Sequence, residues 1–255
     1  FGCAVVYAYP YRRSRFILDL TKAKEIAKEG YVVMIFDPPG LGYSEGVFPS
    51  WNLSLNSLNL FFRYFAPLET PLHYYTGEWK RAVIDAISFL LSFENTKYLV
   101  DRESLALIGH SLGGATVIDV ASEDSYNFSA VVAISFTDIK KVKDVKAPTL
   151  FISGDLDFFS IFALITLFSY KIANPPRELI MIQSATHLGF TTVGYTKNPA
   201  PPWQKKISLY YTINWLDYFV KGKVEAYNNL TTPLPHLSKI FHSRYNFDGE
   251  DHILK

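Results

Sequence analysis

Short, almost continuous apolar runs alternate along this chain with longer segments of helical character, and this alternation constrains the fold more than any other feature. Strands that are apolar on both faces are typical of a parallel sheet that is covered by helices on both sides. The sequence therefore predicts an α/β fold with a mostly parallel, doubly wound sheet and right-handed crossovers. The apolar runs lie at residues 3–9, 31–37, 105–110, 130–135, 149–154 and 178–184, and the helical segments at 15–29, 78–93, 111–122, 159–173 and 205–221.

Composition and charge narrow the class of protein. The 255 residues are 49% hydrophobic and 19% charged, which excludes a disordered chain and allows one domain with a large core. With 25 Lys and Arg against 24 Asp and Glu, the net charge is +1, so we expect no nucleic-acid partner. The single cysteine, Cys3, excludes an intrachain disulfide framework and a thiolate metal cluster.

The length of the apolar runs and the start of the chain bear on its location. No uninterrupted apolar run is long enough for a membrane span, so we expect none. The chain begins with Phe1 and shows no charged-then-apolar leader, which suggests a processed chain or a fragment and favours the cytoplasm. A homo-oligomer is compatible with this composition.

Three segments do not follow the alternation. Residues 45–77 are aromatic and polar with little periodicity, which predicts a long connection or a small cap at one edge of the sheet. Residues 222–255 read as a polar C-terminal tail of the same single domain. Residues 37–46 are rich in glycine, but they lack the Gly-Lys-Ser/Thr ending of a phosphate-binding loop, so we interpret them as structural.

The motif Gly109-His110-Ser111-Leu112-Gly113-Gly114 follows an apolar run and opens a helical segment. This is the context of a Gly-x-Ser-x-Gly nucleophile elbow, in which a strained turn exposes the serine oxygen at the carboxyl end of the sheet. The alternative is an ordinary glycine-rich turn with a capping serine. We interpret Ser111 as the nucleophile of a hydrolase.

A serine nucleophile needs a base that is held by an acid, and in this fold the chain order is Ser, then Asp or Glu, then His. His187 follows the run ending at residue 184, and Asp155 and Asp157 follow the run 149–154. The carboxyl ends of parallel strands meet at one edge of a sheet, so both loops should approach Ser111. We predict His187 as the base and prefer Asp157 to Asp155 as the acid.

A developing oxyanion needs two donors. The first should be the backbone N–H of Leu112, directly after the nucleophile, and the second should come from Tyr11, through its backbone N–H or its hydroxyl. Residues 158–170 are apolar almost all round, which indicates a buried helix that could also form a wall of the substrate pocket. The aromatic residues near the site predict an apolar or aromatic substrate, in a pocket lined by Tyr9, His110, Phe158, Phe159 and Phe162.

The segments around the elbow and the acid resemble those of known enzymes. Residues 100–114 and 148–157 are similar to the elbow and acid segments of dienelactone-hydrolase-like and polyester-hydrolase-like α/β-hydrolases, whose last aspartate in this motif is the triad member. Pro10-Tyr11 and residues 37–48 also resemble cocaine esterase and X-prolyl dipeptidyl peptidases, in which the matching tyrosine hydroxyl serves the oxyanion. The peptidases usually carry Tyr where this chain has Leu112.

The resemblance implies an α/β-hydrolase fold that begins at the third strand of the usual sheet, so the first strands would be missing. It implies a serine esterase that cleaves small-molecule or polymeric esters through an acyl-enzyme, without cofactor or metal. A serine peptidase or amidase with the same triad is the first alternative, and a non-catalytic binding protein with a hydrolase fold is the second.

Overall fold

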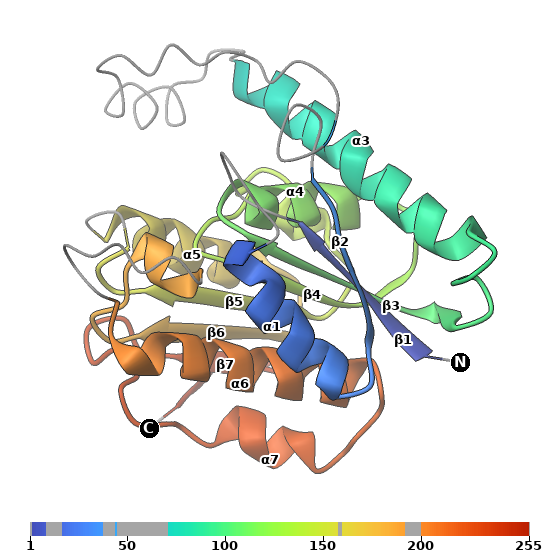
Figure 1. The fold of residues 1–255 in the computed structure, drawn as a ribbon. Helices are drawn as coiled ribbons and strands as arrows, with labels where there is room; N and C mark the ends of the chain where they lie inside the picture. The colour runs from blue at the N-terminus through green and yellow to red at the C-terminus, as the bar shows by residue number, and fades with distance from the viewer. Residues whose placement is uncertain are drawn as a thin grey trace.

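The computed structural model describes residues 2–8, 17–37, 44, 71–157, 160–191 and 200–254, without the side chains of 17–20 and 71–76. Its centre is an eight-stranded sheet in the order β2-β1-β3-β4-β5-β6-β7-β8 (Figure 1). The first six strands are parallel and coincide with the six apolar runs, so the predicted parallel sheet is confirmed. These strands are β1 (Gly2–Ala8), β2 (Val32–Ile35), β3 (Val100–His110), β4 (Phe128–Ile134), β5 (Thr149–Gly154) and β6 (Arg177–Ile182).

Helices cover both faces of this sheet, as the doubly wound prediction requires. Helices α3, α4 and α5 pack on one face, and α1, α6 and α7 pack on the other (Figure 1). The helices are α1 (Ile17–Lys28), α3 (Pro71–Ser92), α4 (Leu112–Ala121), α5 (Ile161–Ile172), α6 (Pro202–Phe219) and α7 (Ala226–Thr231). No helix among the described residues has the length and apolarity that a membrane span demands.

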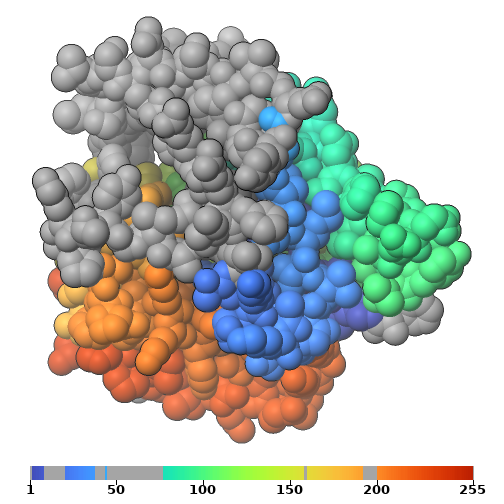
Figure 2. Space-filling view, in the orientation of Figure 1, coloured from blue at the N-terminus to red at the C-terminus, as the bar shows by residue number. Residues whose placement is uncertain are grey.

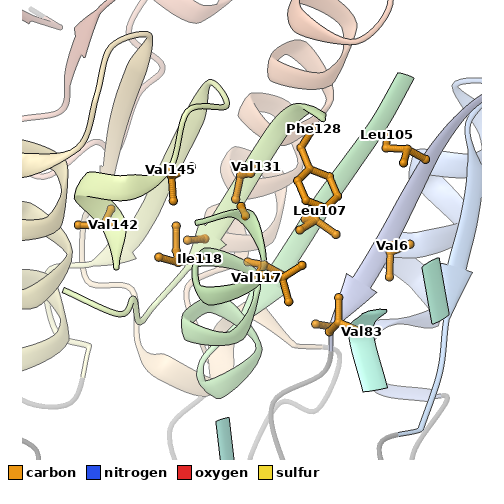
Figure 3. Close-up of a cluster of buried hydrophobic side chains, with 14 of the residues drawn as sticks. Val6, Val83, Leu105, Leu107, Val117, Ile118, Phe128, Val131, Val142 and Val145 are labelled. Carbon is orange, nitrogen blue, oxygen red and sulfur yellow. The ribbon is translucent and has the colours of Figure 1, made fainter. Parts of the chain in front are cut away.

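Two separate apolar cores hold the layers together. On the α3–α5 face, Val83 of α3 and Val117 of α4 pack on Val6 and Leu107 of the central strands (Figure 3). On the other face, α6 contributes Tyr211 and Trp215, which are completely buried. In the space-filling view, α1 lies directly beside α6, with α7 below them (Figure 2). The strands are apolar on both sides because each side faces one of these cores.

The last seven residues of the segment 45–77, which we expected to be irregular, belong to a helix. Helix α3 begins at Pro71 rather than at residue 78, so residues 71–77 are helical. Proline suits this first position because the first N–H groups of a helix have no acceptor within it. Residues 45–70 lie outside the described residues.

Residues 222–255, which we expected to be a polar tail, include regular structure. Besides α7, this segment forms two strands, β7 (Arg244–Asn246) and β8 (His252–Ile253), which extend the sheet antiparallel beyond β6. The carboxylate of Asp251 anchors them by accepting hydrogen bonds from Tyr170 Oη at 2.9 Å and Asn246 Nδ2 at 3.1 Å. Strands of three and two residues are too short to produce a periodic sequence pattern.

Candidate active site

Ser111 lies in the turn between β3 and α4, at the carboxyl edge of the sheet. Its backbone angles are φ 58° and ψ −124°, in a region that residues with a side chain rarely occupy. The N–H of Ser111 donates to the carbonyl oxygen of Ile134 at the end of β4, at 2.8 Å, which holds the turn against the neighbouring strand. The strained backbone and the position at a helix N-terminus are compatible with the predicted nucleophile elbow.

Close backbone approaches explain the glycines of this turn. A Cβ on Gly109 would overlap the carbonyl of Gly113, and a Cβ on Gly114 would overlap the carbonyl of Phe136. The overlapping atoms belong to the backbone and cannot rotate away, so larger residues would force strand and helix apart. Steric contacts therefore require glycine at positions 109 and 114.

The structure brings Ser111, His187 and Asp157 together from three different loops. The Oγ of Ser111 lies 2.8 Å from Nε2 of His187, and Nδ1 of His187 lies 2.9 Å from Oδ1 of Asp157. The side chain of Asp157 is fully buried, whereas that of His187 is 21% exposed. A carboxylate can only accept hydrogen bonds, so Nδ1 carries the proton and Nε2 can accept one from the serine. This is the arrangement in which an imidazole can remove a proton from a hydroxyl.

The carboxylate of Asp157 has one further side-chain donor, and its backbone N–H is bonded as well. The hydroxyl of Ser153, which is buried on β5, donates to Oδ2 at 3.3 Å, opposite the oxygen that faces His187. The N–H of Asp157 donates to the carbonyl of Gly154 at 3.1 Å, which turns the chain back toward the sheet. Ser153 was not among the predicted site residues, although it directly precedes the Gly-Asp-x-Asp motif.

Asp155, the competing acid, faces a different partner. Its Oδ1 accepts a hydrogen bond from the N–H of Ser184 at 2.6 Å, just before the histidine turn. The N–H of Leu156 donates to the carbonyl of Ala185 at 3.2 Å, and a Cβ on Gly154 would overlap that same carbonyl. The acid loop and the histidine loop are thus in direct contact, with Asp157 at the imidazole and Asp155 at the backbone.

His110 does not line a pocket, contrary to the prediction. Its side chain is only 1% exposed and lies beneath His187, with ring centroids 5.0 Å apart. Its Nε2–H donates to the carbonyl oxygen of His187 at 3.1 Å. Burial, the nearby His187 and Lys22 together lower the pKa of the His110 imidazole well below its usual value. The neutral ring therefore supports the histidine turn from below.

The three residues of this site lie in a region that matches the model of a known protein family. A family model described as PET hydrolase-like matches residues 80–247, which is more than half of the chain and includes Ser111, Asp157 and His187. The chain belongs to the PET hydrolase-like family. A second model, described as serine aminopeptidase S33, matches residues 19–137, which include the elbow but neither Asp157 nor His187. The two matches and the sheet identify this PET hydrolase-like chain as a hydrolase with the α/β-hydrolase fold.

Part of the predicted oxyanion site and pocket of this PET hydrolase-like protein lies outside the described residues, namely Tyr9, Tyr11, Phe158 and Phe159. Leu112 is described and is the first residue of α4, where a backbone N–H has no acceptor within the helix. That N–H adjoins Ser111 at the positive end of the helix dipole, where negative charge is favoured.

An aromatic side chain lies beside the imidazole in the described part of the site, and two exposed leucines adjoin site residues along the chain. The ring centroid of Phe162, on α5, lies 5.1 Å from that of His187. Leu156 precedes Asp157 and is 55% exposed, and Leu188 follows His187 and is 47% exposed. Phe162 as a residue of the substrate pocket stays a prediction. In the described part of the chain, no cluster of three or more His, Cys, Asp or Glu side chains could hold a metal ion.

Proposed function

We propose that the protein is a serine hydrolase that cleaves carboxylic esters. The observation that carries this proposal is the continuous hydrogen-bonded series from Ser111 Oγ through the His187 imidazole to Asp157, with steps of 2.8 and 2.9 Å. The membership in the PET hydrolase-like family favours an ester as the substrate. The exposed Leu156 and Leu188 favour an apolar acyl or alcohol group.

The reaction would proceed in two halves. Ser111 Oγ attacks the ester carbonyl carbon while His187 Nε2 takes the hydroxyl proton, and Asp157 stabilises the imidazolium that forms. The N–H of Leu112 donates to the oxyanion of the tetrahedral intermediate. His187 then gives its proton to the leaving alcohol, and the acyl group remains on Ser111. Water, deprotonated by the same imidazole, attacks the acyl-enzyme and releases the carboxylic acid.

Replacement of the nucleophile tests this mechanism. Ser111→Ala should lower kcat for a short-chain nitrophenyl ester by roughly 10⁴-fold or more, because serine and histidine act as a unit. A fluorophosphonate should label the wild-type protein at Ser111 and leave Ser111→Ala unlabelled. Ser129→Ala is the control, since Ser129 binds the carbonyl of Glu103 at the far end of β4. Retained turnover in Ser111→Ala would contradict the proposal.

A peptidase or amidase with the same groups is the second candidate. The partial match to the serine aminopeptidase model favours it. A panel of nitrophenyl esters and aminoacyl anilides separates the two, because both leaving groups are followed by absorbance. The esterase proposal expects turnover of the esters and little turnover of the anilides. A higher kcat/KM for an anilide would favour the peptidase.

A non-catalytic binding protein is the third candidate. It would need a disrupted set of groups, whereas Ser111 and His187 lie within hydrogen-bond distance. The labelling experiment also tests this candidate, because a fluorophosphonate reacts only with an activated serine.

A further inference from the structure

The residues just before His187 leave the sheet, and their backbone groups find partners in side chains. Strand β6 ends at Ile182, and His187 follows after a short irregular segment, residues 183–186. Ser184 in this segment has φ 56°, a left-handed conformation that does not continue a strand. Buried backbone groups outside regular structure need other hydrogen-bond partners. The partners chosen here determine where the imidazole lies.

Gln204 binds both backbone groups of the residue that precedes His187. Its Oε1 accepts a hydrogen bond from the N–H of Thr186 at 3.2 Å, and its Nε2 donates to the carbonyl oxygen of Thr186 at 2.7 Å. Gln204 lies in the first turn of α6 and is completely buried. A primary amide is one of few side-chain groups that can accept and donate in this paired geometry.

The other side of the histidine turn is shaped around the same amide. A Cβ on Gly189 would overlap Oε1 of Gln204, so only a glycine allows the amide to approach this closely. The N–H of Gly189 donates to the carbonyl of Thr186 at 3.2 Å, which closes the turn around His187. The turn and the amide thus form one packed unit on the side of α6.

Two further side chains hold the ends of this segment. Asp155 accepts from the N–H of Ser184 at 2.6 Å, and His110 donates to the carbonyl of His187 at 3.1 Å. Each of them makes one such bond from an adjacent loop of the site. Gln204 makes two, from a helix that contributes none of the predicted site residues.

We propose that Gln204 is a positioning residue of this site, which orients the His187 imidazole between Ser111 and Asp157 through the backbone of Thr186. This inference rests on the proposed function. A displacement of the imidazole by a fraction of an ångström lengthens the contact to Ser111 Oγ and slows proton transfer, while substrate binding is unaffected. The inference therefore concerns kcat and the reactivity of Ser111 more than KM.

Gln204→Met and Gln204→Glu test the inference. Methionine keeps the length of the side chain but removes both hydrogen bonds. Glutamate keeps an acceptor for the N–H of Thr186 and loses the donor to its carbonyl. We expect Gln204→Met to lower kcat and the rate of fluorophosphonate labelling by about 10- to 100-fold, with KM within about 2-fold of the wild type. The kcat and labelling rate of Gln204→Glu should lie between those of Gln204→Met and the wild type.

Thr212→Val is the matched control. Thr212 is also fully buried on α6, and its hydroxyl donates to the carbonyl of Ser208 at 2.7 Å. This variant also loses a buried hydrogen bond on α6, at a distance from Thr186. We expect a lower Tm with unchanged kcat and labelling rate. The ¹⁵N resonances of His187, assigned with a His187→Gln variant, should move in Gln204→Met and stay in place in Thr212→Val.

The possible results separate this inference from the proposed function. If Ser111→Ala loses turnover while folded Gln204→Met keeps the wild-type kcat, labelling rate and His187 resonances, the positioning role is wrong and the function stands. If Ser111→Ala keeps turnover, the proposed function is wrong. Should Gln204→Met not fold, hydrogen exchange at the Thr186 amide of the wild-type protein decides. Slow exchange is expected, and exchange as fast as that of an exposed amide overturns the inference.

Discussion

The nucleophile turn and the histidine turn must meet within 2.8 Å, yet they are held in place by different means. The nucleophile turn depends mainly on close backbone approaches, since Gly109 and Gly114 allow the backbone to approach the carbonyls of Gly113 and Phe136. The histidine turn depends on side chains from elsewhere, with Asp155, His110 and Gln204 bonded to its backbone. One turn is thus shaped mainly by close backbone contacts, and the other mainly by hydrogen bonds from side chains.

Because the two turns are held differently, we expect them to respond differently to mutation. A steric constraint fails abruptly, because a backbone overlap cannot be relieved by a small adjustment. A set of hydrogen bonds fails gradually, since the loss of one bond leaves the others in place. We therefore expect changes in the nucleophile turn to affect folding first, and changes around the histidine turn to affect reactivity or pH dependence.

The largest effect is expected for Gly109→Ala. The added methyl group overlaps the carbonyl of Gly113, so the variant should lose more than about 4 kcal/mol of stability or fail to accumulate in folded form. Urea unfolding measures this loss. Gly77→Ala is the matched control, because Gly77 lies in α3 with no heavy atom within 4 Å of an added Cβ. That control should gain roughly 0.5–1 kcal/mol. Similar stabilities of the two variants would contradict a steric role for Gly109.

The next largest effect is expected on kcat, when the two aspartates of the acid loop are replaced one at a time. Asp157→Asn cannot hold the imidazole in the tautomer that accepts a proton from Ser111, and should lower kcat by about 10⁴-fold. Asp155→Asn keeps an oxygen that can accept the N–H of Ser184, so it should lower kcat by less than about 10-fold. Nitrophenyl ester kinetics at neutral pH measure both. A larger loss for Asp155→Asn would show that the hydrogen bonds to the histidine turn outweigh the contact to the imidazole.

A smaller effect is expected in the pH dependence of stability, through His110. Its pKa is well below 6.5 in the folded protein and about 6.5 in the unfolded chain. Below pH 6.5 the unfolded chain binds a proton that the folded protein does not. As the pH is lowered below 6.5, the free energy of unfolding should therefore decrease by about 1.4 kcal/mol per pH unit, until the folded-state pKa is reached.

His110→Gln isolates this contribution, because it keeps a donor for the carbonyl of His187 and removes the titrating group. Urea unfolding at pH 7.5 and 5.5 should show a smaller decrease for the variant, by roughly 1.4 kcal/mol. The same decrease in both proteins would mean that His110 is protonated in the folded state.

The smallest effect is expected for Ser153→Ala. The variant loses the hydrogen bond to Oδ2 of Asp157 while the contact to His187 remains, so stability should fall by about 1 kcal/mol. Ser122→Ala is the control, as Ser122 binds the carbonyl of Asp119 at the end of α4. Wild-type stability of Ser153→Ala would show that this hydrogen bond does not stabilise the fold.

The same distinction explains what could be predicted from the sequence. The six parallel strands are continuous apolar runs, and the motif around Ser111 is local, so both could be recognised without a structure. His187 and Asp157 were predicted from their order along the chain and from their positions after strands, and the structure places their side chains 2.9 Å apart. Each of these features is encoded in a few neighbouring residues.

The features that were missed depend on contacts between distant residues. Gln204 is a polar residue at the start of a helix, and nothing in its surroundings predicts complete burial. His110 follows an apolar strand, and its sequence position does not determine whether the ring faces the pocket or the core. The preference for Asp157 over Asp155 was not missed, but spacing alone could not decide it, since two residues of spacing allow either to face the histidine.

The short strands β7 and β8 have a consequence for the behaviour of the protein at high concentration. A long, unpaired strand edge is a template for pairing with another chain and promotes aggregation. Beyond β6 the sheet narrows to three residues in β7 and two in β8, so this edge of the described sheet has little backbone left to pair. The segment that looked like a tail thus shields the strand that leads to His187 from association with other molecules.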